Sequence, residues 1–182
     1  MYGKKLLEQQ DAIQPKTIDA SYRIETPQFA FELQPHNGDK FLIKQNGREH
    51  ILLYPAATNL HSHERQAWIR DVIKMRLRSR AKEILPGRLQ QLATRHGFRY
   101  SSVSLRDSHT RWGSCSSRGS ISLSIYLVLL PNELIDYVLL HELCHTVEMN
   151  HSDKFWALLD KVCRCDSRTL RQALRKHKCD IL

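Results

Sequence analysis

The sequence has no apolar run that approaches the roughly 20 residues needed to span a bilayer. Its first residues, MYGKKLLE, include charges but no long apolar stretch, so they lack the pattern of a secretory signal. Internal repeats and low-complexity tracts are also absent, which argues against a repeat architecture. Five cysteines, an odd number, without an export signal predict free thiols and a cytoplasmic location with no membrane association.

Acidic residues are few relative to basic ones, with 19 against 28 and a formal net charge of +9. Two concentrations of basic residues lie on segments predicted to be helical. The first contains Lys74, Arg78 and Lys82 along one side, with Arg76 and Arg80 on another, and the second contains Arg168, Arg171, Arg175, Lys176 and Lys178. A basic face attracts polyanions, so nucleic acid is a possible partner through these helices. The alternative is that both clusters are ordinary solvated helix surfaces.

Length and composition predict a soluble α+β protein with one packed domain. The chain has 182 residues and 41% hydrophobic residues, enough to build a real core. We expect residues 1–20 to form a loosely ordered N-terminal arm and residues 21–182 to form a single domain. Within that domain, residues 21–58 are predicted to form a β-meander, and residues 59–182 the catalytic core.

The meander is predicted from alternation and turn residues. Phe29, Phe31 and Leu33 alternate with polar residues, as in a half-buried strand. Asn37-Gly38 and Asn46-Gly47 are typical of type I′ turns, so both are predicted to close hairpins.

Helices and strands alternate in the remainder of the chain. A helical stripe begins near Glu64, and Pro86-Gly87 is predicted to break it into two helices, the second of which ends at Gly97. Residues 100–106 and 120–126 read as strands, and further helices are predicted from residues 131, 153 and 167.

The most informative motif is His141-Glu142-Leu143-Cys144-His145, which reads H-E-x-x-H. The preceding residues, PNELIDYVLL, predict a mostly apolar helix that begins with proline. On a helix, His141 and His145 project from one face about one turn apart and can bind one Zn²⁺. Glu142 can then act on a metal-bound water without binding the metal itself. The motif therefore predicts a zinc hydrolase whose general base is Glu142.

Two residues compete for the position of third ligand. Glu148 would lie on the face of both histidines if the helix continued. His151 can bind only if the helix ends first, and Asn150 tolerates the left-handed conformation that ends helices. Ser152 then resembles the N-cap of a new helix. We favour His151, which gives a metal site of His141, His145 and His151.

The stretch from residue 111 to residue 156 resembles the YgjP-like metallopeptidase domain, a bacterial family of predicted metal-dependent hydrolases related to SprT-like zincins. The motifs that carry the resemblance are RWGSC at 111–115, IDYV at 135–138, HELCH at 141–145, NHS at 150–152 and FW at 155–156. A weaker likeness begins at residue 80. The resemblance implies a zincin-like core, in which a small sheet packs against the helix carrying H-E-x-x-H. It also implies that the three histidines bind zinc and that Glu142 is the base.

Substrate contacts are predicted on the segments before this helix. The cations around Arg111 could bind a phosphate or a peptide carboxylate. Ser124 is a further candidate, although the family usually has asparagine there. By resemblance to zincins, an extended substrate pairs with an edge strand beside the metal. Residues 120–126 are the candidate for that strand, and the alternative is an ordinary sheet strand.

Three functions are compatible with these residues. The first is a zinc metallopeptidase that acts on a peptide, which we favour mainly from the family resemblance. The second is a metal-dependent phosphohydrolase that acts on a nucleotide held by the basic loop. The third is a nucleic-acid-binding module with a structural metal, against which Glu142 argues because a structural site has no use for it. One Zn²⁺ is the expected cofactor, and other divalent metals could occupy three imidazoles.

Overall fold

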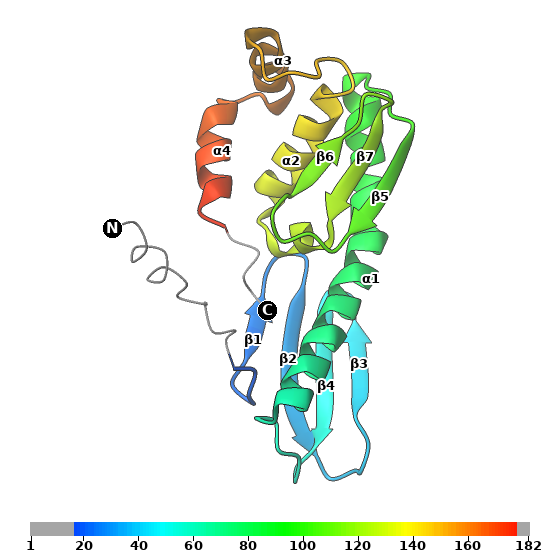
Figure 1. Cartoon of the computed structure of the whole chain (residues 1–182), viewed down its shortest axis with the longest axis vertical. Helices are drawn as coiled ribbons and strands as arrows, with labels where there is room; N and C mark the ends of the chain where they lie inside the picture. Colours follow the sequence, from blue (N-terminus) through cyan, green and yellow to red (C-terminus); the bar gives the residue numbers. More distant parts are fainter. Residues whose placement is uncertain (1–16, 178–182) are drawn as a thin grey trace, which may run out of the picture.

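The computed structural model describes residues 17–177, which form two small sheets placed along one long helix (Figure 1). The helix is α1 (His63–His96). The first sheet contains β1 (Arg23–Glu25), β2 (Ala30–His36), β3 (Leu42–Asn46) and β4 (Glu49–Pro55). The second contains β5 (Ser102–Arg106), β6 (Gly113–Cys115) and β7 (Ser120–Ser124). The predicted α+β class is confirmed.

Further short elements complete the fold. A 3-10 helix, η1 (Ile125–Leu129), follows β7 and is entirely buried. The helix α2 (Asn132–Cys144) carries most of the H-E-x-x-H motif, with His145 as its C-cap, and α3 (Asp153–Cys163) and α4 (Ser167–Arg175) follow it. The helix α2 contacts α1, β6, α3 and α4, so the motif lies where these elements meet (Figure 1).

The first sheet has the order β1-β2-β4-β3, so the prediction of a meander is wrong. Strands β2 and β4 pair in parallel, and β3 pairs with β4 in the antiparallel sense. In this order β4 lies between β2 and β3. Residues 37–41, which connect β2 to β3, therefore span about two strand spacings, or roughly 10 Å. The Asn37-Gly38 turn consequently does not close a hairpin.

The second predicted turn does close a hairpin, but with a different geometry. Asn46 pairs with Glu49, which leaves Gly47 and Arg48 at the centre of the turn. Gly47 has a φ of 56°, whereas Arg48 is not among the residues with positive φ. A type I′ turn needs positive φ at both central residues, so this turn is not of that type.

The predicted break at Pro86 does not occur, and α1 continues through this residue. Proline in a helix interior costs about 3 kcal/mol relative to alanine. Leu85 and Leu89, on either side, are fully buried, and each buried leucine contributes about 2 kcal/mol. Packing therefore offsets the lost hydrogen bond.

The packed structure begins earlier than predicted. Residues 1–16 of the predicted arm lie outside the described residues. Ile18, however, is buried, and its backbone N–H donates to Gln66 Oε1 at 2.9 Å. The arm therefore does not extend to residue 20.

Candidate metal centre

The three histidines of the predicted site converge at the C-terminal end of α2. His141 Nε2 lies 3.2 Å from His145 Nε2 and 3.0 Å from His151 Nε2. Two ligands of a tetrahedral zinc with Zn–N bonds of 2.0–2.1 Å are about 3.3 Å apart. Among the described residues, this is the only group of three or more metal-ligating side chains close enough to share an ion. The donor set therefore fits one divalent cation.

The turn after α2 brings His151 back to the other two histidines. Thr146 N–H donates to Leu143 O, and Val147 and Glu148 N–H both donate to Cys144 O. These tight turns replace the expected left-handed residue, because Arg164 is the only non-glycine residue with positive φ between residues 17 and 177. The prediction for Asn150 is thus wrong, although the chain does reverse.

Glu148 contributes its backbone and not its carboxylate to this arrangement. The carbonyl oxygen of Glu148 lies 3.1 Å from His145 Nδ1, and only an N–H can bond to it. His145 therefore carries its proton on Nδ1, which leaves the lone pair of Nε2 free for a metal.

Aromatic residues of α3 hold the imidazole rings in place. The Phe155 ring is fully buried, stacks on His145 at 4.5 Å and meets His141 edge-on at 4.9 Å. Trp156 stacks on His151 at 5.6 Å. The sequence offered Phe155-Trp156 only as part of the family motif, and no role for these rings was predicted.

The site favours neutral imidazoles. Burial, followed by the neighbouring His145 and His151, lowers the pKa of His141 to about 3. Burial also lowers the pKa of His151, with His145 adding to the effect. Neutral imidazole is the form that binds metals, so His141 and His151 need little proton release to accept a cation.

Glu142 lies next to the histidines with its side chain buried against β6. The residue is 5% exposed, and burial raises the pKa of its carboxyl to about 7. A divalent cation nearby would oppose this shift, because it favours the ionised carboxylate. A Cβ placed on Gly113 would lie within 2.9 Å of three side-chain atoms of Glu142. Gly113 is the neighbour that sequence reasoning did not identify.

Ser124 is not placed to bind substrate. It is 2% exposed, and its hydroxyl donates to Ser108 O at 2.8 Å and accepts from Tyr126 N–H at 3.3 Å. The strand that ends at Ser124 lies between β5 and β6, so the prediction that residues 120–126 form an edge strand is also wrong. The edge strand beside α2 is β6.

Several of the predicted basic residues have contacts within the fold. Lys74 lies 3.9 Å from Asp107, Arg78 donates to Leu105 O, and Arg171 lies over the Trp156 ring. Arg111 is exposed and lies two residues before the start of β6. Binding of nucleic acid through the basic helices stays a prediction.

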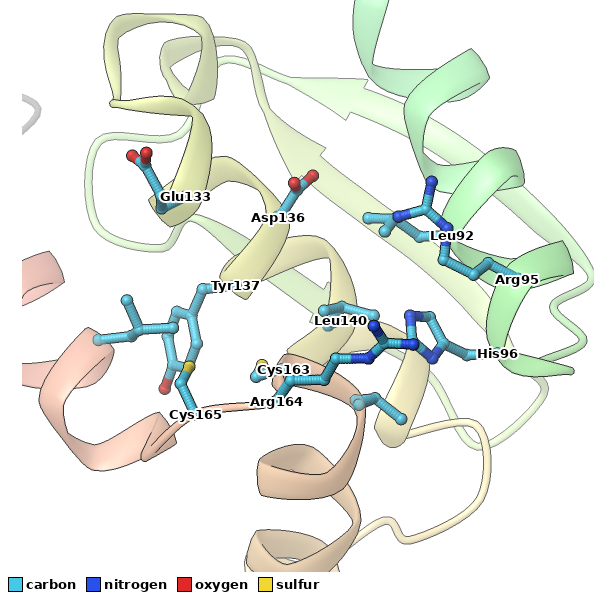
Figure 2. Close-up of a pocket in the computed structure, with 12 residues that line it drawn as sticks. Leu92, Arg95, His96, Glu133, Asp136, Tyr137, Leu140, Cys163, Arg164 and Cys165 are labelled. Atoms are coloured by element: carbon cyan, nitrogen blue, oxygen red, sulfur yellow. The ribbon is translucent and has the colours of Figure 1, made fainter.

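A hollow of about 440 Å³ lies on another side of α2 (Figure 2). Glu133, Asp136 and Tyr137 of α2 line it together with Arg95 and Arg164. None of the three histidines lines it, so this hollow is separate from the metal centre.

A search of the helices within residues 17–177 found no candidate for a membrane span.

Comparison with solved structures gives distant similarities. The metallopeptidase zymogen abylysin of Pyrococcus abyssi is 22% identical, with a TM-score of 0.46 over 51% of this chain and 93% of that one. The metallopeptidase zymogen jannalysin of Methanocaldococcus jannaschii is 19% identical, with a TM-score of 0.44 over 50% and 94%. No curated protein matches the chain.

The comparison with protein families gives a match over nearly the whole sequence. Residues 4–177 match the family described as the YgjP-like metallopeptidase domain, a span that contains both sheets and all three histidines. The resemblance read from the motifs is thereby confirmed, and the chain belongs to the YgjP-like metallopeptidase domain family as a metal-dependent hydrolase.

Proposed function

We propose that the protein is a zinc-dependent peptidase in which His141, His145 and His151 hold one Zn²⁺ and Glu142 is the general base. The observation that carries this proposal is the convergence of three Nε2 atoms, with the buried carboxyl of Glu142 on the residue that follows His141. A purely structural site has no need of such a carboxylate. Membership of a metallopeptidase family favours a peptide over a nucleotide as substrate.

The bound cation would supply Lewis acidity, polarising the scissile carbonyl and acidifying the attacking water. Glu142 would accept the proton of that water and pass it to the leaving amine. Burial alone raises the pKa of the Glu142 carboxyl to about 7, and a bound cation would lower it again and so favour the ionised carboxylate, which is the form that accepts a proton. The His145 ring, held by the Glu148 carbonyl, would keep its orientation during this exchange.

The extended substrate would bind along β6. Within residues 17–177 this strand pairs with β7 alone, so its other edge is available there for backbone hydrogen bonds with a peptide. Arg111, exposed just before β6, would then meet an acidic group or the carboxylate of the peptide.

Peptide cleavage by the zinc-loaded protein, with and without a chelator, tests the proposal. We expect cleavage of a peptide library, no hydrolysis of nucleoside triphosphates, and loss of cleavage with the chelator. Glu142→Gln should keep the zinc content of the wild type and lower kcat by about 100–10,000-fold, the usual contribution of a general base. Full activity of Glu142→Gln on a verified peptide would show that another group is the base.

A further inference from the structure

Gly113 lies so close to Glu142 that no side chain fits between them. A Cβ on Gly113 would lie 2.7 Å from Glu142 Oε1, 2.8 Å from Cγ and 2.9 Å from Cδ. Carbon atoms in favourable contact are about 3.5–4.0 Å apart. A larger residue at this position must therefore displace either β6 or the Glu142 side chain.

Strand β6 is the less mobile of the two partners. Gly113 pairs with Leu123 in the antiparallel ladder with β7. Ser124 N–H donates to the Trp112 carbonyl at 2.9 Å. The Ser124 hydroxyl donates to the carbonyl oxygen of Ser108, in the loop between β5 and β6. Among the residues that the structure describes, no hydrogen bond holds the Glu142 carboxylate, so its position depends on packing. An added methyl group would accordingly move the carboxylate before it moved the strand.

The face of β6 that carries Gly113 is turned toward Glu142. Cys115, two residues farther along, lies on the same face because side chains alternate along a strand. Burial, followed by the charge of Glu142, raises the pKa of the Cys115 thiol, which places this residue near the same carboxylate. The wall beside Glu142 is thus formed by a glycine and a half-buried cysteine.

We propose that Gly113 is a positioning residue for catalysis, because its missing side chain determines where the Glu142 carboxylate rests. This inference rests on the proposed role of Glu142 as general base. It adds a steric requirement on β6 that the H-E-x-x-H motif does not contain.

The test is Gly113→Ala, with Gly87→Ala as the matched control. An added Cβ at Gly87 meets nothing within 4 Å, and Gly87 does not have positive φ. For Gly113→Ala we expect the zinc content of the wild type, a nearly unchanged KM and a kcat about 100-fold lower, as expected for a base displaced by about 1 Å. For Gly87→Ala we expect wild-type kinetics. Unchanged kcat in Gly113→Ala would overturn the inference.

A double-mutant cycle, measured by thermal unfolding of the metal-free protein, distinguishes a positioning role of Gly113 from general damage to the sheet. Gly113→Ala should lower Tm by about 2–6 °C when Glu142 is present. In a Glu142→Ala background, which removes the crowded atoms, the same substitution should leave Tm nearly unchanged. Equal losses in both backgrounds, or failure to fold in both, would mean that Gly113 meets something other than Glu142, and the inference would be wrong.

The two proposals fail in different ways. Full activity of Glu142→Gln would remove the proposed base, and the role of Gly113 with it. An inactive Glu142→Gln together with a fully active Gly113→Ala would contradict only the role of Gly113.

Discussion

The three histidine side chains of the candidate metal centre are oriented by neighbouring residues outside that group. The carbonyl oxygen of Glu148 fixes the tautomer of His145, and Phe155 packs against two of the three rings. Such outer contacts typically change metal affinity by about 10–100-fold when they are lost. Because Glu148 acts through its backbone, its side chain is expected to be dispensable.

Zinc titration of His151→Ala and Glu148→Ala tests which residue is the third ligand. His151→Ala removes one of three nitrogens, so we expect zinc affinity to fall by more than the roughly 100-fold seen for an outer contact. Glu148→Ala keeps the carbonyl that bonds to His145, so its affinity should stay near that of the wild type. The opposite ranking would assign the ligand to the Glu148 carboxylate.

At the scale of elements, α1 shows how packing overrides a local signal. Ser62 caps the helix by accepting from Arg65 N–H, and Gly97 ends it with a φ of 74°. The apolar residues Ile69, Ile73, Leu77, Leu85 and Leu89 are all fully buried between these ends. The strain at Pro86 is tolerated because residues on both sides of it belong to the same core.

The substitution Pro86→Ala should therefore stabilise the protein. An alanine at this position would supply the missing N–H to the carbonyl of Lys82 and remove the ring clash, so we expect the free energy of unfolding to rise by about 1–3 kcal/mol. Urea denaturation would measure the change, with an unchanged m-value as the sign that the fold is intact. A lower free energy of unfolding would mean that α1 requires proline at this position.

On the scale of the whole molecule, α1 joins the two sheets. Its 34 residues span about 51 Å, and the first sheet lies beside its N-terminal half while β5, β6 and β7 lie beside its C-terminal half (Figure 1). Buried side chains from both regions belong to one hydrophobic cluster. The metal centre lies at the end of the molecule formed by α2 and α3.

Zinc should consequently stabilise the whole fold. A ligand that binds only the native state at 1,000 times its Kd adds about 4.1 kcal/mol, which corresponds to a rise in Tm of roughly 8–16 °C for a chain of this size. Differential scanning calorimetry with zinc and then with a chelator would measure the rise and its reversal. A similar rise in His151→Ala would place the stabilising zinc elsewhere.

The sequence by itself was sufficient to predict the α+β class, the helix that carries H-E-x-x-H and the three histidines that the structure brings together. These predictions succeeded because helical spacing fixes His141 and His145 on one face whatever surrounds them. Ser152 was also a local signal, and it occupies the N-cap position of α3, although its side chain makes no capping hydrogen bond.

Tertiary structure alone decided the strand order, the continuity of α1 and the neighbours of the carboxylate. Which strands pair depends on contacts between distant segments, so turn residues such as Asn37-Gly38 could not reveal the parallel pairing of β2 and β4. The contact of Gly113 with Glu142 joins residues 29 positions apart in the sequence, and no periodicity within either segment records it. Local spacing thus determined which side chains can bind a metal, and packing between segments determined which residues surround the Glu142 side chain.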